Sequence, residues 1–181
     1  MPLSDNPRPA MDFETLARRV RDTCRLSGRF TLRSGQISDT YFDKYLFESD
    51  PELLNEVAAH AADLIPPETE VLAGLELGGV PIATALSLLT GIPTAFVRKE
   101  AKTYGTAKLA EGAELGGRRV LVVEDVITTG GQVAVSTRAL RDRGALVDSV
   151  LCAIDRSNGD HATLDSVDLS VIALFTSADL D

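Results

Sequence analysis

The chain has 181 residues, of which 44% are hydrophobic and 25% are charged, a balance typical of one soluble globular domain. Its formal net charge of −9 argues against general binding to nucleic acid, which requires a basic surface. The apolar stretch at 169–175 is too short to cross a bilayer, and residues 1–10 lack the apolar core of a signal peptide. We therefore expect a cytoplasmic protein with no membrane partner. Two scattered cysteines, Cys24 and Cys152, are expected to be reduced core thiols.

The first part of the chain is predicted to form a helix, a pair of extended segments and a second helix. Apolar residues at helical spacing predict the first helix over residues 12–26. Residues 29–47 read as short extended segments around a Ser34-Gly35 turn. Asp50 is a suitable N-cap and Pro51 suits a first helical turn, so the second helix is expected to start there.

From residue 70 onward, strand and helix patterns alternate. Strands are expected at 71–75, 94–97, 119–123, 145–154 and 169–175, with helices at 80–89 and 132–143 and a long loop at 99–117. This alternation predicts an α/β fold with a doubly wound parallel sheet and flanking helices. In such folds the ligand lies beyond the carboxyl ends of the strands, so polar residues at those ends are the candidates for a site.

The most specific local pattern follows the third of these strands. It reads Val120-Leu121-Val122-Val123-Glu124-Asp125-Val126-Ile127-Thr128-Thr129-Gly130-Gly131-Gln132. A turn rich in threonine and glycine before a helix can point several backbone N–H groups at one position, and the helix N-terminus adds partial positive charge. Residues 128–132, called the cradle below, therefore predict a site for a phosphate monoester.

Two adjacent carboxylates, Glu124 and Asp125, precede the cradle. Because side chains alternate along a strand, both can reach one ligand only where the strand is ending. There they could accept hydrogen bonds from the vicinal hydroxyls of a ribose. The alternative is an acidic loop that caps a helix and binds nothing, but the full string is more specific than that.

A basic segment, Arg98-Lys99-Glu100-Ala101-Lys102-Thr103-Tyr104-Gly105-Thr106, follows the second strand of the predicted sheet. Its three cations concentrate positive charge in an otherwise acidic chain. A cationic lid would stabilise a leaving group whose negative charge grows as the bond breaks, and it would exclude water. A solvated charged loop is the alternative reading.

These two segments resemble motifs of a known family. The string at 120–132 resembles the motif with which type I phosphoribosyltransferases bind 5-phosphoribosyl-1-diphosphate (PRPP). The resemblance implies that Glu124 and Asp125 hold the ribose hydroxyls and assist catalysis, and that the cradle holds the 5-phosphate. It also places Val126 and Ile127 in the PRPP site.

The basic segment resembles the catalytic loop of the orotate phosphoribosyltransferases, which reaches across a dimer interface into the neighbouring site. The resemblance implies that Arg98, Lys99 and Lys102 bind diphosphate, with Lys102 catalytic. Tyr104, where many members have His, falls in the same PRPP site. Tyrosine can still donate a hydrogen bond, although it is neutral at pH 7.

Two further segments resemble the same family. Residues 30–43 resemble its N-terminal hood, which covers the orotate ring, and imply a phosphate contact for Arg33. Arg156 follows Asp155 at a predicted strand end, where the family holds orotate; an arginine can grip a carboxylate bidentately. Thr128 is the second residue assigned to orotate. Taken alone, the hood segment could be a β-hairpin with core aromatics, and Asp155-Arg156 a surface pair.

The chain departs from the family at Leu77-Gly78, where many members have an aromatic residue and a lysine that binds diphosphate. The resemblance then implies that Arg33 or the basic segment compensates for the missing lysine. A plain strand-to-helix turn is the alternative for this segment.

The resemblance spans residues 30–156 and implies the transfer of a phosphoribosyl group from PRPP to orotate, giving orotidine 5′-monophosphate and diphosphate in pyrimidine biosynthesis. It implies Mg²⁺ held mainly through PRPP, with no protein ligand, and a homodimer with shared active sites. Residues 1–181 would form one domain, with hood elements at about 12–47 and a core at about 51–181. Two alternatives remain open: a phosphoribosyltransferase for another base, and a regulator that binds PRPP without turnover, which the acidic charge disfavours.

Overall fold

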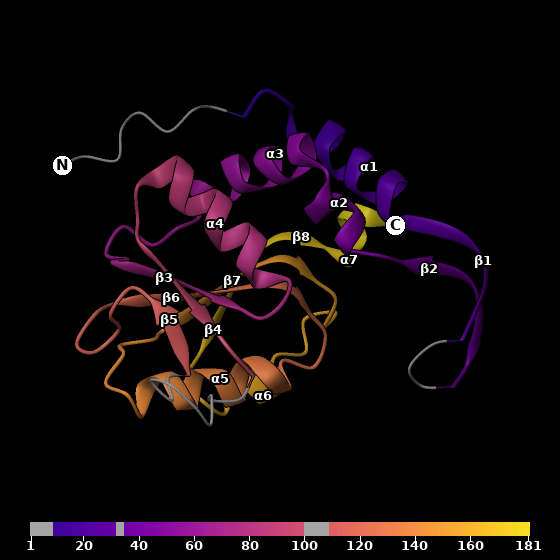
Figure 1. The fold of residues 1–181 in the computed structure, drawn as a ribbon. Coiled ribbons are helices and arrows are strands. Elements are labelled where there is room, and N and C mark those ends of the chain that lie inside the picture. Colours follow the sequence, from indigo (N-terminus) through magenta and orange to yellow (C-terminus); the bar gives the residue numbers. More distant parts are fainter. Residues whose placement is uncertain (1–8, 32–34, 100–108) are drawn as a thin grey trace.

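The structure is a computed structural model that describes residues 9–31, 35–99 and 109–181. A central sheet with strand order β5-β4-β3-β6-β7-β8 forms its core (Figure 1). All neighbouring strands are parallel except β5, which pairs antiparallel with β4. The predicted α/β fold with a mostly parallel sheet is therefore confirmed. The strands are β3 (Val71–Leu75), β4 (Thr94–Val97), β5 (Ala110–Gly112), β6 (Val120–Ile127), β7 (Ser149–Asp155) and β8 (Ser170–Thr176).

Helices cover both faces of this sheet (Figure 1). One face packs against α1 (Phe13–Cys24), α3 (Pro51–Ala62) and α4 (Gly79–Thr90) in a cluster whose largest buried side chains include Phe47 and Phe175. The other face packs against α5 (Gly131–Arg141) and α6 (Ala162–Asp165) around Leu140. Strands buried on both faces explain the nearly continuous apolar runs in the sequence.

Aspartate side chains cap both helices in the first part of the chain, and the cap at Asp50 was predicted. The Asp12 carboxylate accepts a hydrogen bond from the Thr15 N–H at 2.8 Å, and α1 begins at the next residue. The Asp50 carboxylate accepts hydrogen bonds from the N–H groups of Glu52 and Leu53, and α3 begins at Pro51. Each cap satisfies backbone donors that have no partner inside the helix.

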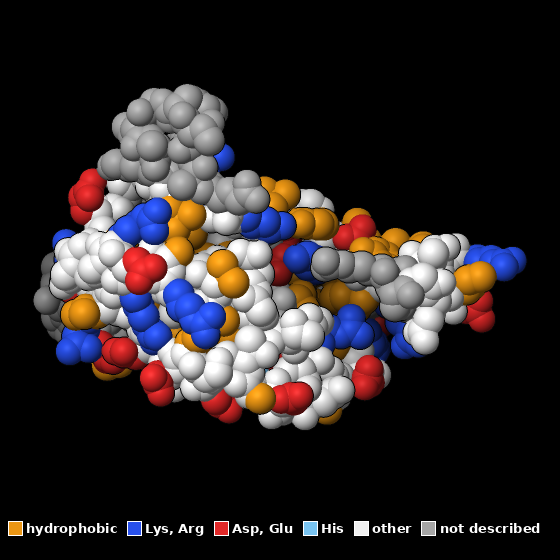
Figure 2. Space-filling model, turned by 90° about the horizontal axis from the view of Figure 1, so that it is seen from below, with side chains coloured by type: hydrophobic (Ala, Val, Ile, Leu, Met, Phe, Trp, Pro, Cys, Tyr) orange, Lys and Arg blue, Asp and Glu red, His pale blue; other side chains and the backbone are white. Residues whose placement is uncertain are grey.

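Between α1 and α3 the chain forms a separate hairpin of β1 (Arg25–Thr31) and β2 (Ile37–Phe42), paired antiparallel. Figures 1 and 2 show this hairpin projecting from the body as an arm. Ile37 and Tyr41 on β2 are exposed, and the Tyr41 ring packs against Phe30 with centroids 5.5 Å apart. The predicted extended segments are therefore present, and the residues between the two strands (32–34) lie outside the described ranges.

The structure corrects three details of the sequence prediction. Part of the segment predicted to be extended is a short helix, α2 (Tyr45–Ser49), because it turns Phe47 into the core. The predicted loop at 99–117 contains the edge strand β5. Strand β6 runs through the acid pair to Ile127, because its pairing with β7 continues that far, so the acids do not follow the strand but belong to it.

Two further short elements, α6 and α7 (Ser177–Leu180), were not anticipated, and β7 starts four residues later than predicted. Both cysteines are buried and free, as expected. Within the described ranges, no helix combines the length and the apolar character needed to cross a membrane.

Candidate active site

A cleft of about 490 Å³ opens at the carboxyl ends of β3 and β6. The chain proceeds from β3 toward one edge of the sheet and from β6 toward the other, so these neighbouring strands mark the point where the winding reverses. Ligands of doubly wound sheets bind at this point. The cleft is lined by Lys44, Tyr45, Glu76, Leu77, Gly78, Lys99 and residues 124–133.

The predicted acid pair lies in the wall of this cleft. Asp125 is 1% exposed and Glu124 is partly buried. Glu124 Oε1 accepts a hydrogen bond from the Asp125 N–H at 3.0 Å, and Asp125 Oδ1 accepts one from the Val126 N–H. Burial, followed by the neighbouring Asp125 carboxyl, raises the pKa of Glu124 to about 9. Burial and the neighbouring carboxylate therefore oppose a second negative charge beside Asp125.

The cradle follows directly and leads into α5. Thr128 and Thr129 are exposed to the cleft, and Gly131 is the first residue of the helix. Gly130 has φ +69°, and an added Cβ would lie 2.7 Å from Leu164 Cγ, so only glycine suits this position. The first turn of α5 offers backbone N–H groups that lack intrahelical acceptors. The geometry is that of an anion site at a helix N-terminus.

The turn after β3 forms the facing part of the cleft. A Cβ added at Gly78 would overlap Asp125 Oδ2, so the Asp125 carboxylate occupies the space in which a side chain at 78 would start. On the same turn, Glu76 Oε1 accepts a hydrogen bond from the Lys99 N–H. The missing side chain at position 78 is thus a requirement of the local packing.

Lys44 is the residue that sequence reasoning missed. Its ammonium forms an ion pair and hydrogen bond with Asp125 Oδ2 and lies 5.1 Å from the centroid of the Tyr45 ring. Lys44 stands at the start of α2, which Phe47 anchors in the core. The only available signal was its position one residue beyond the hood segment, because pairing between residues 81 positions apart leaves no local pattern.

The predicted basic segment is only partly described. Lys99 lines the cleft, whereas Arg98 is not among the lining residues and its N–H bonds to the Leu109 carbonyl at 2.9 Å. Lys102 and Tyr104, together with Arg33 of the hood, lie outside the described residues. Their assignments stay predictions.

A second cavity, of about 560 Å³, lies between the hairpin, α1 and the end of β7. Arg156 lines it, and its guanidinium carbon is 5.4 Å from the centroid of the Phe42 ring. Thr128, the other residue assigned to orotate, lines the first cleft instead. The two openings are adjacent, because the Arg156 N–H donates to the Ile127 carbonyl at 2.8 Å.

Asp155 does not form the surface pair that was the alternative reading of Asp155-Arg156. Its Oδ2 lies 2.8 Å from His161 Nε2, and its Oδ1 accepts a hydrogen bond from the Ser157 N–H. Burial opposes the charged form, but these contacts lower the pKa of Asp155. With Asp155 directed at other partners, Arg156 packs beside an aromatic ring of the hairpin.

Comparisons with known proteins identify the family. The family model for the phosphoribosyl transferase domain matches residues 47–169. An orotate phosphoribosyltransferase from a Nocardioides species is 59% identical over 167 residues, covering 92% of this chain and 93% of that protein. The crystal structure of Mycobacterium tuberculosis orotate phosphoribosyltransferase with Fe(III) dicitrate aligns with a TM-score of 0.85 and 34% identity, covering 94% of this chain and 99% of that chain.

The same Mycobacterium tuberculosis enzyme has been solved in complex with PRPP. That structure aligns with a TM-score of 0.80 and 31% identity, again covering 94% of this chain and 99% of that chain. A family model that matches most of the chain and a relative this similar over nearly its full length place the chain in one family. The chain belongs to the phosphoribosyltransferases and, within them, to the orotate phosphoribosyltransferases.

Proposed function

We propose that this chain transfers the 5-phosphoribosyl group of PRPP to orotate, releasing diphosphate and forming orotidine 5′-monophosphate in pyrimidine biosynthesis. The observation that carries the proposal is the cleft at the end of β6, where a buried acid pair stands directly before a phosphate cradle. A ribose bearing a 5-phosphate needs these two features side by side.

In the proposed mechanism the cradle binds the 5-phosphate through backbone N–H groups and the hydroxyls of Thr128 and Thr129. Glu124 and Asp125 hold the ribose hydroxyls, and the Asp125 carboxylate favours positive charge at the ribose as diphosphate leaves. Lys99 and, from the sequence, Arg98, Lys102 and Tyr104 stabilise the departing diphosphate. Catalysis rests on positioning and electrostatics and needs no covalent nucleophile.

Orotate is proposed to lie between the cradle and the second cavity. Its ring would be covered by the hairpin aromatics, and its carboxylate would pair with Arg156. Support comes from the packing of Arg156 against Phe42 and from the hydrogen bond that joins Arg156 to the end of β6. Arg33 is kept as a phosphate contact on the resemblance alone.

Mg²⁺ is part of the proposal and would be held mainly through oxygens of PRPP. The cleft fits this arrangement, because a hard cation prefers oxygen ligands, which PRPP itself supplies, and the negative charge of Asp125 in the wall favours a bound cation. Among the described residues no three His, Cys, Asp or Glu side chains gather into a metal cluster. When bound, the ion would supply positive charge to the leaving diphosphate.

We further propose a homodimer in which Lys102 of one subunit serves the cleft of its partner. The projecting hairpin, with Ile37 58% and Tyr41 44% exposed, gives a two-fold partner an apolar surface to cover. Residues 1–181 are proposed to act as one domain, with the hood at about 12–47. A cytoplasmic location is proposed because both buried cysteines are free thiols, which suits a reducing compartment.

The direct test of this function is an assay with PRPP, Mg²⁺ and orotate that follows the fall in orotate absorbance. A parallel panel of uracil, adenine and hypoxanthine tests the other bases, and the variant Asp125→Asn serves as the control for contaminating activity. We expect turnover with orotate alone and almost none in the variant. Turnover of another base in preference to orotate, or PRPP binding without turnover of any base, would refute the assignment.

A further inference from the structure

Lys44 occupies a position in the cleft for which the proposed mechanism gives no role. Its ammonium contacts Asp125 Oδ2, the same oxygen against which Gly78 packs without a side chain. The turn after β3 therefore cannot carry a cation at position 78, and Lys44, the N-cap of the neighbouring α2, provides one in front of the same carboxylate.

The charges of the cleft make this lysine significant. Among the described residues that line it, three are acidic (Glu76, Glu124 and Asp125) and two are basic (Lys44 and Lys99). Lys99 stands next to Glu76, which accepts its backbone N–H. A ligand with several phosphates requires positive charge in the cleft, and Lys44 is one of the two described lysines that provide it.

Lys44 is also placed to exchange partners. Its side chain is 31% exposed, whereas that of Asp125 is 2% exposed, so the lysine lies in the open part of the cleft and covers the carboxylate in its wall. Burial opposes the charge, but the contact with Asp125 raises the pKa of Lys44 and keeps the ammonium charged. Its flexible four-carbon stem lets the ammonium swing while the backbone stays fixed at the start of α2.

Substrate chemistry determines where the ammonium would go. If ribose hydroxyls bind Asp125, they displace Lys44 from the oxygen it now contacts. The diphosphate of PRPP is attached to the ribose carbon next to the one that carries the 2-hydroxyl, so it enters the space beside Asp125. A displaced ammonium held in that space meets the diphosphate as its nearest new partner.

We propose that Lys44 is a PRPP ligand that neutralises Asp125 in the free protein and binds the diphosphate group when the ribose hydroxyls replace it on Asp125. This assignment rests on the proposed function, in which the acid pair holds the ribose. It identifies the cation that stands in for the side chain missing at position 78.

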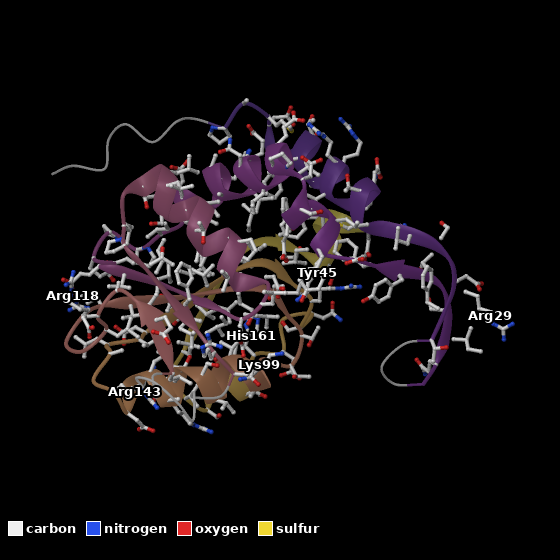
Figure 3. All side chains as sticks on the ribbon, in the orientation of Figure 1. Arg29, Tyr45, Lys99, Arg118, Arg143 and His161 are labelled. Carbon is white, nitrogen blue, oxygen red and sulfur yellow. The ribbon has the colours of Figure 1, made fainter. Side chains whose placement is uncertain are left out.

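The first test compares two ligands by calorimetry in buffer containing Mg²⁺: PRPP, and ribose 5-phosphate, which lacks the diphosphate. We expect Lys44→Met to weaken PRPP binding about ten- to a hundredfold, as for a lost charge-assisted hydrogen bond, and to change ribose 5-phosphate binding much less. The control Arg118→Met removes an exposed cation near the amino end of β6, where it pairs with Glu70, far from Tyr45 (Figure 3). It should bind both ligands as the wild type does.

The second test uses the unaltered protein and so does not depend on the folding of a variant. The chain has four lysines, and brief acetylation followed by mass spectrometry reports the reactivity of each. We expect ribose 5-phosphate to increase acetylation of Lys44, because it frees the ammonium from Asp125. PRPP should instead protect Lys44.

Either test can overturn the proposal. In the first, Lys44→Met would weaken the binding of both ligands equally or leave both unchanged. In the second, both ligands would change the acetylation of Lys44 equally. Either result would leave Lys44 as a partner of Asp125 alone. If the wild-type protein did not bind PRPP at all, the proposed function would fail first and this inference with it. If the wild-type protein bound PRPP normally, but neither Lys44→Met nor Lys44 acetylation distinguished PRPP from ribose 5-phosphate, only this inference would be overturned.

Discussion

The two walls of the cleft are built in different ways. The wall at the end of β6 comes from one run of residues, 120–132, which carries a buried strand, the acid pair, the cradle and the start of α5. The opposite wall is assembled from Lys44 at the start of α2, the turn at Gly78 and Lys99 after β4. A contiguous run shows its chemistry in the sequence, whereas an assembled wall shows it only after folding.

The β6 wall and the hairpin that borders the second cavity also differ in how well they are packed. Strand β6 is buried between its neighbours, and Leu164 occupies the space in which a side chain at position 130 would start. Among the described residues, the two strands of the hairpin that borders the second cavity pair with each other and with no other strand, and Ile37 and Tyr41 are exposed. We therefore expect changes near β6 to abolish turnover and changes near the hairpin to alter the affinity for the base.

The largest effect is expected where the two walls touch, in Gly78→Ala. The new methyl group would overlap the Asp125 carboxylate, so the acid must move. A misplacement of about 1 Å can cost about a hundredfold in rate. Steady-state kinetics with PRPP and orotate should show this loss, while circular dichroism shows a folded protein.

The matched control for that variant is Gly116→Ala. Its added Cβ would lie 3.7 Å from the Arg143 carbonyl, an ordinary contact, and Gly116 is not among the residues that line the cleft. Wild-type activity in Gly78→Ala would show that the position of Asp125 does not matter for turnover.

A smaller effect is expected on the hairpin side, in Arg156→Ala. Loss of a charge-assisted contact with the orotate carboxylate should cost roughly 1.5–3 kcal/mol, about ten- to a hundredfold in orotate affinity, and leave PRPP binding intact. Calorimetry with each ligand measures both values. Unchanged orotate affinity would show that Arg156 is a surface residue packed on Phe42.

The same contrast determines how much could be predicted from sequence. The fold and the family were predicted correctly, because strand alternation and the 120–132 string are local signals. Helix α2 was missed because five residues are too few to show a helical period, and Phe47 directs its formation through tertiary packing. The end of β6 was placed too early because the pairing of Ile127 with Asp155 is a long-range contact. Lys44 was missed for the same reason.

The shared site can be tested by mixing subunits. Lys102→Ala and Asp125→Asn are each expected to be nearly inactive, and equal amounts should exchange so that about half of the dimers are mixed. Each mixed dimer would hold one site with both changes and one with neither, so roughly a quarter of the sites should regain activity. If mass spectrometry shows exchange and no activity returns, Lys102 acts within its own subunit.

The smallest effect concerns stability at the junction of α2 and the acid pair. Glu48 is 7% exposed, and burial, followed by the charge of Asp125, raises its pKa from 4.5 to about 8. A carboxyl whose pKa is raised by folding stabilises the protein below its unfolded pKa, and this contribution is lost as the pH rises toward the folded pKa. Wild-type stability should therefore fall between about pH 4.5 and 8.

Glu48→Gln removes this titration, so thermal unfolding of the two proteins should diverge as the pH rises. We expect the unfolding temperature of the variant, compared with that of the wild type, to be a few degrees higher at pH 8.5 than at pH 5. Part of the wild-type decline should persist in the variant, because Glu124 also has a raised pKa. Parallel curves over this range would mean that Glu48 stays ionised in the folded protein.

The central claim is that the β6 wall binds PRPP, and a crystal structure of the chain with PRPP and Mg²⁺ tests it most directly. The 5-phosphate should accept hydrogen bonds from backbone N–H groups of residues 128–132, and the ribose hydroxyls should contact Glu124 and Asp125. The second cavity offers a concrete alternative, because Arg21, Arg25 and Arg156 line it and could attract phosphate. A 5-phosphate bound among those arginines, with the cradle unused, would contradict the account.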